Sequence, residues 1–183
     1  METTTTPTTA ATANTAETDQ CAQMFTPPQK EHAWLQKLLG AWTFESECLG
    51  EPGQPTAKFS GKETVKALGG LWIVGEGAGE MPGGGTGLTM ITLGFDPKRN
   101  RFVGTWVGSM MTHLWVYEGE LDTSGRVLTL NAEGPSFTDP GKQAKYQDVI
   151  EIKSDDHRIL TSRTLGDDGT WTQFMTAHYR RQK

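Results

Sequence analysis

Three ionisable side chains in the second half of the chain have the chemistry to orient or activate a bound molecule: His113, Asp148 and Arg163. Each lies in a segment where polar and apolar residues alternate, and each falls on the mostly apolar side of that alternation. A polar group on a dry face needs a partner. We therefore expect Asp148 to face Arg163 across two strands and to form a charge-assisted hydrogen bond with it.

The Asp148–Arg163 pair has two interpretations. In the first, the pair orients the polar end of a ligand, or tunes a catalytic carboxylate, inside a pocket of low dielectric. In the second, it is a structural ion pair between neighbouring strands, placed near the mouth of the fold. The sequence leaves both open. It also leaves open an enzyme in which His113 or Asp148 acts as the general base.

The chain has four histidines, and their spacing is irregular. Scattered histidines do not predict a zinc site, so no metal is expected. His113 is interpreted as a proton shuttle, as a metal or haem ligand, or as a hydrogen-bonded histidine of the wall. His178 is a second candidate haem ligand only if its strand turns it inward, and is otherwise a surface residue.

Short strands with a period of two must position these residues. Gln29 to Leu39 predicts one short helix with a single apolar stripe, which Gly40 ends. From Trp42 onward the alternation predicts ten strands, at 42–48, 57–68, 70–80, 87–95, 101–108, 111–121, 126–134, 144–153, 158–165 and 171–180. The connections are short turn clusters, which force antiparallel neighbours. Closure removes sheet edges, so the fold class is all-β: an up-and-down antiparallel barrel.

The turns set the registers of the hairpins. A turn at 97–100 pairs Phe95 with Phe102, and a turn at 122–125 pairs Tyr117 with Leu130. A turn at 154–157 pairs Asp148 with Arg163. The last hairpin has two options: a two-residue turn puts His178 on the face of Arg163, and a three-residue turn puts Tyr179 there.

These registers give the barrel an inner wall with apolar bulk and a few polar groups, as is typical of a small-molecule pocket. We expect it to bind a mostly apolar or aromatic ligand, with no cofactor. The predicted wall consists of Phe44, Cys48, Trp106, Met111, His113, Trp115, Tyr117, Tyr146, Asp148 and Arg163.

The net charge of the 183-residue chain is −5, and its distribution is uneven. Residues 1–29 contain Glu2, Glu17 and Asp19 and no Lys or Arg, so they carry −3 and leave −2 for the rest. Residues 1–27 are rich in Thr and Ala and predict a disordered tail, with the barrel domain at 28–183. An acidic chain disfavours nucleic acid as a partner. The chain has no apolar run of the ~18 residues that a membrane span needs, and no signal-peptide pattern, so we expect a cytoplasmic protein.

The segment from Met111 to Tyr117 carries apolar residues on both faces. An apolar strip on the outside of a barrel must be covered. We expect a homodimer through this region, although the N-terminal helix could cover the same strip.

Two resemblances add to this interpretation. The segment Gly40-Ala41-Trp42, after a short helix and at the head of the first strand, resembles the Gly-x-Trp signature of the calycins, the superfamily that contains the lipocalins. That resemblance implies that a basic residue of the last strand, Arg180 or Arg181, lies over Trp42 in a cation–π contact. It also brings the alternative of a haem-binding barrel similar to the nitrobindins.

At the level of whole segments the chain is similar to a bacterial family known as domain of unknown function 1579. The similarity covers about residues 30–183 and rests on the segments at 69–72, 104–111, 114–119, 133–137 and 174–181. It implies a lipocalin-like barrel and carries no settled activity.

Overall fold

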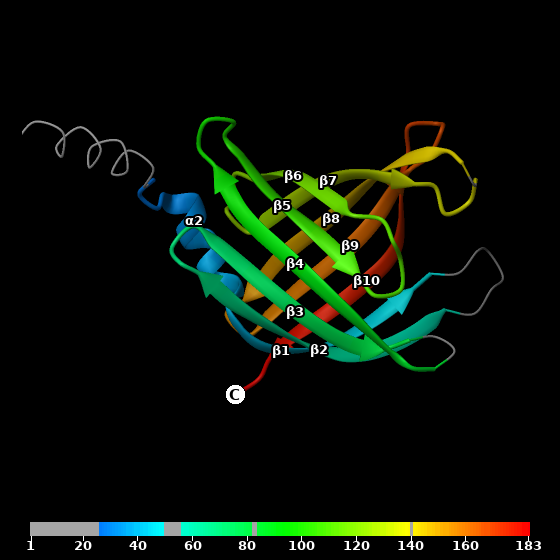
Figure 1. The fold of residues 1–183 in the computed structure, drawn as a ribbon, viewed down its shortest axis with the longest axis horizontal. Coiled ribbons are helices and arrows are strands. Elements are labelled where there is room, and N and C mark those ends of the chain that lie inside the picture. The colour runs from blue at the N-terminus through cyan, green and yellow to red at the C-terminus, as the bar shows by residue number, and fades with distance from the viewer. Residues whose placement is uncertain (1–25, 50–55, 82–83, 140) are drawn as a thin grey trace, which may run out of the picture.

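The computed structural model describes residues 26–49, 56–81, 84–139 and 141–183 of the chain. Nearly all of the predicted tail therefore lies outside the described residues. The described part is a closed barrel of ten antiparallel strands, so the predicted fold class is confirmed (Figure 1). Each strand pairs with its neighbours in sequence, and β1 closes the barrel on β10.

The strand bounds agree with the predicted ranges within two residues, except at the sixth strand. The sixth strand begins at Trp115 rather than at residue 111, so Met111 and His113 lie in the β5–β6 connection. The strands are β1 Gly40–Cys48, β2 Ala57–Leu68, β3 Trp72–Glu80, β4 Thr86–Asp96, β5 Arg101–Gly108, β6 Trp115–Leu121, β7 Val127–Pro135, β8 Gln143–Ser154, β9 His157–Leu165 and β10 Trp171–Arg181.

A short helix closes one end of the barrel (Figure 1). It comprises α2, Lys30–Leu35, and the 3-10 turn η1, Gln36–Leu38. Its apolar stripe, Trp34, Leu35 and Leu38, is buried in the same core as the inward side chains of the strands. Gly40 then turns the chain into β1 at φ 117°, which a residue with a side chain rarely adopts.

Trp42 anchors this closed end. Its indole Nε1 donates to the carbonyl of Leu38 at 2.9 Å, which ties the first strand to the helix. The guanidinium of Arg181 lies 4.2 Å from the centre of the Trp42 ring and donates to the carbonyls of Lys37 and Leu39. Arg181, and not Arg180, is thus the basic residue over the signature tryptophan; Arg180 is exposed on the outer surface.

The first two predicted hairpins keep the predicted faces. Phe95 pairs with Phe102 as expected. Leu130 pairs with Gly119 rather than with Tyr117, a shift of two residues. A shift of two leaves every side chain on its face, so Tyr117 still points inward.

The third hairpin is where the predicted register is wrong. His157 pairs with Ser154, but Arg158 pairs with Ile152, so the intervening Lys153 forms a bulge. This one extra residue in β8 shifts the pairing of β8 with β9 by one residue. Each β8 residue before the bulge therefore pairs with the neighbour of the β9 residue that was expected, and that neighbour has its side chain on the opposite face. Asp148 therefore pairs with Ser162, and Arg163 pairs with Gln147.

The last hairpin contains a second irregularity, between Gln173 and Met175. Gln173 lies opposite Arg163, and His178 lies opposite Ile159. His178 thus shares the face of Arg163, as the two-residue option required, but that face is the outer one. Ala177 and Tyr179 point inward instead.

Candidate functional site

The central polar group of the interior is the carboxylate of Asp148 on β8. The hydroxyls of Tyr117, on β6, and Ser162, on β9, each donate a hydrogen bond to a different oxygen of this carboxylate. Burial raises the pKa of Asp148 above its ordinary value, and the two hydroxyls oppose that shift in part. Burial is the largest cause, and the Asp148 charge the next, of a pKa of Tyr117 well above its usual range. The phenol therefore stays protonated and donates its hydrogen bond to Asp148.

A buried ion pair lies nearer the closed end. Arg158 of β9 donates through Nη2 to the carboxylate of Glu63 on β2, and both side chains are almost fully buried. The guanidinium lies between two aromatic rings, 4.8 Å from the centre of Trp42 and 4.3 Å from that of Tyr179. Burial, with a smaller contribution from Glu63, also raises the pKa of Tyr179 far above its usual range.

Aromatic side chains gather at the barrel end opposite the helix. The ring of Trp115 lies 5.0 Å from Tyr146, and Phe137, in the β7–β8 connection, lies 5.2 Å from Tyr146 and 5.8 Å from Phe174. Phe137 nevertheless keeps 62% of its surface exposed. The cluster thus lines this end without sealing it.

Two of the predicted residues sit beside this cluster in the β5–β6 connection. The Trp115 indole Nε1 donates to the sulfur of Met111 at 3.1 Å. The imidazole of His113 lies 4.8 Å from the Trp115 ring, and its Nε2 is 3.2 Å from the carbonyl oxygen of Glu133. His113 is therefore a hydrogen-bonded residue of the rim.

Part of the inner wall keeps accessible surface. Several large side chains of the inner faces are only partly buried, among them Phe44, Ile91, Trp106, Asp148, Leu160 and Tyr179. Asp148 and Tyr179 point inward and are among them, and burial is the main cause of the raised pKa of each group. On β3 the inward positions 75, 77 and 79 are glycines, so this stretch of β3 adds no side chains to the wall, and Ile91, Thr89 and Phe44 lie against it.

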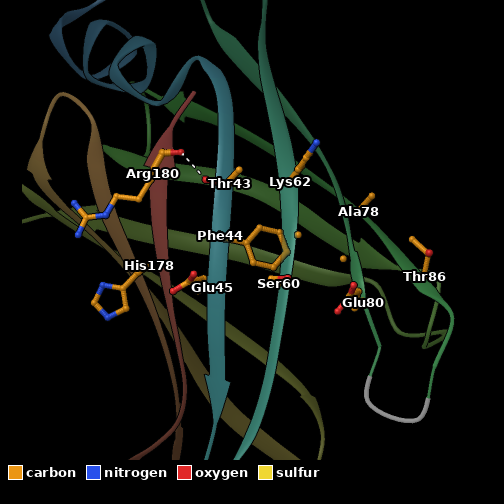
Figure 2. A pocket seen from close by; sticks show the side chains of 12 residues that line it. Thr43, Phe44, Glu45, Ser60, Lys62, Ala78, Glu80, Thr86, His178 and Arg180 are labelled. Carbon is orange, nitrogen blue, oxygen red and sulfur yellow. Dashed lines mark hydrogen bonds between the residues drawn. The ribbon is translucent and has the colours of Figure 1, made fainter. Parts of the chain in front are cut away.

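The structure also shows a groove of about 760 Å³ over β1, β2, β3, the start of β4 and β10; its lining is mostly outward side chains, and it reaches the ring of Phe44 (Figure 2). Its charged lining residues are Glu45, Lys62, Glu80 and Arg180, with His178 at one side. His178 stacks on His157, and Nδ1 of His178 is 3.3 Å from Nε2 of His157. Sequence reasoning missed this groove, because its outward residues show the same alternation as any solvated strand face.

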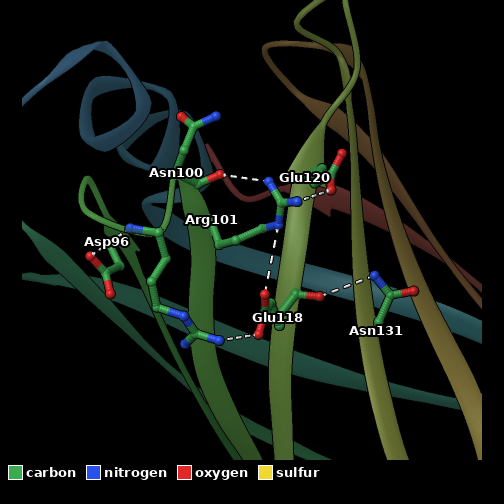
Figure 3. A network of polar contacts seen from close by, with 7 residues as sticks. Asp96, Asn100, Arg101, Glu118, Glu120 and Asn131 are labelled. Atoms are coloured by element: carbon green, nitrogen blue, oxygen red, sulfur yellow. Dashed lines mark hydrogen bonds and ion pairs between the residues drawn. The ribbon is translucent and has the colours of Figure 1, made fainter.

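Arg163 lies outside the barrel and is not part of the interior site, contrary to the sequence expectation. Its Nε donates to Gln147 at 2.7 Å, and Gln147 donates to Asn131 at 2.7 Å. Asn131 in turn joins the surface network around Glu118, in which Arg101 pairs with Glu118 and Glu120 (Figure 3). Arg163 is therefore a member of a polar outer surface.

The remaining predicted residues fall into two groups. Trp115, Tyr117, Tyr146 and Asp148 meet on the inner faces of β6 and β8, with Met111 and His113 at the adjoining rim. Phe44 and Trp106 line other parts of the inner wall, and the ring of Phe44 lies 5.3 Å from that of Tyr179. Sequence reasoning missed Glu63, Arg158 and Ser162, and it offered Tyr179 only through the three-residue option for the last turn.

The side chains that could ligate a metal are not clustered in the described part of the chain. It contains no group of three His, Cys, Asp or Glu side chains placed to hold a metal ion. Its one cysteine, Cys48, is a free thiol, and burial raises the pKa of that thiol. His178 lies on the outer face and cannot serve as a haem ligand from within the barrel.

Comparisons with known proteins agree with this architecture. The profile of a family described as "Protein of unknown function (DUF1579)" matches residues 27–181. A search among curated proteins returned no relative. Among solved structures, Rv2717c from M. tuberculosis is 12% identical with a TM-score of 0.60, over 86% of this chain and 100% of that chain. The S-type phycobiliprotein lyase CPES from Guillardia theta is 14% identical with a TM-score of 0.55, over 84% of this chain and 93% of that one.

Proposed function

The chain belongs to the DUF1579 family, and we propose that it is a binding protein that holds a small, mostly apolar or aromatic molecule inside its calycin-like barrel. One observation carries the proposal. Side chains of the inner faces, Asp148 and Tyr179 among them, keep accessible surface although they point into the barrel. This accessible inner surface is what a molecule bound within the barrel would contact.

The chemistry of the walls indicates the ligand class. Aromatic and aliphatic side chains provide most of the inner surface, among them Phe44, Trp106, Tyr146 and Leu160. A mostly apolar pocket with a few convergent polar groups is the usual form of a small-molecule site. Asp148, with the hydroxyls of Tyr117 and Ser162, supplies the polar point that fixes orientation.

The ligand enters, in this proposal, through the end opposite the helix. At the other end Leu35, Leu38 and Trp42 fill the barrel. The rim residues Met111, His113 and Phe137 lie in the connections between strands, where movement costs less than within the ladders.

A titration with a neutral apolar fluorophore, N-phenyl-1-naphthylamine, tests this proposal. We expect one molecule to bind per chain with enhanced fluorescence. Leu160→Trp adds bulk to the interior and abolishes this binding, whereas the neighbouring Thr161→Trp adds the same bulk on the outer face and leaves it intact. Circular dichroism and thermal melting verify that both variants fold. Equal affinity for the two variants would contradict an interior site.

We also propose that two copies associate through the outer face of β4, β5 and β6. Large apolar side chains remain exposed there, including Met90, Val107, Leu114 and Val116. The helix α2 lies at the barrel end and leaves this strip uncovered (Figure 1).

In the described residues no helix is long and apolar enough to cross a membrane. A cytoplasmic location is part of the same proposal, and cell fractionation checks it.

A further inference from the structure

We infer that the interior site selects molecules with a protonated amine at one end, with the ammonium group held at Asp148. This inference rests on the proposed binding function and specifies its ligand class. It follows from the charges of the interior, from the free acceptor capacity of Asp148 and from the rings around it.

The inward charges are unbalanced. Glu63 and Arg158 form an ion pair and neutralise each other. Asp148 makes no ion pair with any residue that the structure describes, and its two partners are neutral hydroxyls. A buried carboxylate without a counter-charge is costly, so a cation is the partner that this position favours.

Asp148 also has acceptor capacity to spare. An ionised carboxylate offers about four lone-pair sites. Tyr117 and Ser162 each occupy one site, on different oxygens. The residue is only partly buried, and no further hydrogen bond to its carboxylate is present among the described residues, so the remaining sites can accept from a ligand.

Aromatic rings complete the environment of a cation. Tyr117 is bonded to the carboxylate itself, and Tyr146 lies two residues away on the same inner face of β8. Trp115 lies two residues from Tyr117 on the inner face of β6 and contacts Tyr146. Ammonium groups are attracted to the faces of such rings, most strongly to Trp, and more so when desolvated.

The barrel already holds one cation in this way. The Arg158 guanidinium combines a carboxylate partner, Glu63, with two flanking rings, Trp42 and Tyr179. Asp148 has a carboxylate and aromatic neighbours on the same inner faces, but no cationic partner among the described residues. An amine ligand would supply the missing member at this second position.

Three naphthalene probes that differ only in their end group test the inference: 1-naphthylmethylamine, 1-naphthalenemethanol and 1-naphthoate. Isothermal titration of the wild-type protein should show the amine binding about 10- to 100-fold more tightly than the alcohol, the range expected for a charged hydrogen bond, with the carboxylate weakest. Asp148→Asn should remove the preference while alcohol binding persists. Glu151→Gln removes the same charge from the outer face of β8 and should change neither affinity.

The outcomes separate the two proposals. Equal or weaker binding of the amine, with the alcohol still bound inside, would overturn the inference and leave the binding function standing. Failure of all three probes to bind would overturn both. Amine binding that persists in Leu160→Trp would be surface binding and would also overturn the inference. The wild-type comparison decides the matter even if Asp148→Asn fails to fold.

Discussion

Arg158 illustrates how a charge survives inside this barrel. Its guanidinium gains a carboxylate from Glu63 and two aromatic faces, from Trp42 and Tyr179. Each group compensates for part of the hydration that burial removes. The arrangement is therefore stable only as a unit, because removal of one charge leaves the other buried and unpaired.

We predict that Glu63→Ala lowers the free energy of unfolding by about 3–5 kcal/mol, since it leaves Arg158 buried without a partner. The double variant Glu63→Leu/Arg158→Met should lose much less, because it replaces both charges with apolar groups. Urea denaturation of the wild type, Glu63→Leu, Arg158→Met and the double variant measures the coupling. Additive losses would show that the pair does not act as a unit.

Asp148 makes stability depend on pH in the sense opposite to that of most surface carboxylates. Burial raises its pKa above the ordinary value of 3.8, so between these two values the folded protein holds a proton that the unfolded chain releases. The free energy of unfolding contributed by this group therefore falls as the pH rises through that window. Asn does not titrate, so Asp148→Asn removes this contribution to the pH dependence of stability.

The measurement compares wild type and Asp148→Asn by urea denaturation from pH 4 to pH 7. We predict that the stability of the wild type relative to the variant declines as the pH rises. A difference that stays constant over this range would mean that Asp148 carries its charge in the fold without cost.

At the scale of elements, the β8–β9 hairpin shows that the sequence predicted the strands but not their register. Alternation predicted both strands within a few residues. It could not predict the bulge at Lys153, because Lys153 breaks no pattern, and its neighbours alternate on either side. One unpaired residue moved Arg163 to the outer surface and brought Ser162 to Asp148, so a correct strand assignment still gave a wrong pair.

The helix is the other element on which the barrel depends. Leu35 is fully buried in the closed end, while Lys37, two residues later, is exposed. We predict that Leu35→Ala costs about 2–5 kcal/mol through lost burial and the cavity that it leaves. Lys37→Ala should cost less than about 0.5 kcal/mol, as is usual for an exposed position. Chemical denaturation of both variants checks this, and similar losses would contradict the role of the helix as a plug.

At the scale of the whole molecule, the closed barrel was predictable because period-two alternation, short turns and the cost of open edges all favour it. The inner position of Trp115, Tyr117, Tyr146 and Asp148 was predictable for the same reason. The Glu63–Arg158 pair was not, because its members are 95 residues apart and only the closure of β1 on β10 brings their strands to one end. Long-range pairing of this kind leaves no local trace in the sequence.

The exposed strip on β4 to β6 makes a prediction about assembly. Leu114 and Val116 are exposed at 51% and 60%. We predict that the wild type sediments as a dimer at tens of micromolar and that Val116→Lys shifts it to a monomer. Thr112→Lys, in the connection beside the strip, serves as the control. A monomeric wild type under these conditions would exclude this interface.

The central claim is that the inside of the barrel, and not its surface groove, holds the ligand. The most direct measurement is an isotope-filtered NMR experiment on the wild-type protein with bound N-phenyl-1-naphthylamine. The account predicts contacts between the aromatic protons of the probe and the methyl groups of Ile91 and Leu160, which point inward. Contacts confined to Thr43 and Thr86, which line the outer groove, would contradict it.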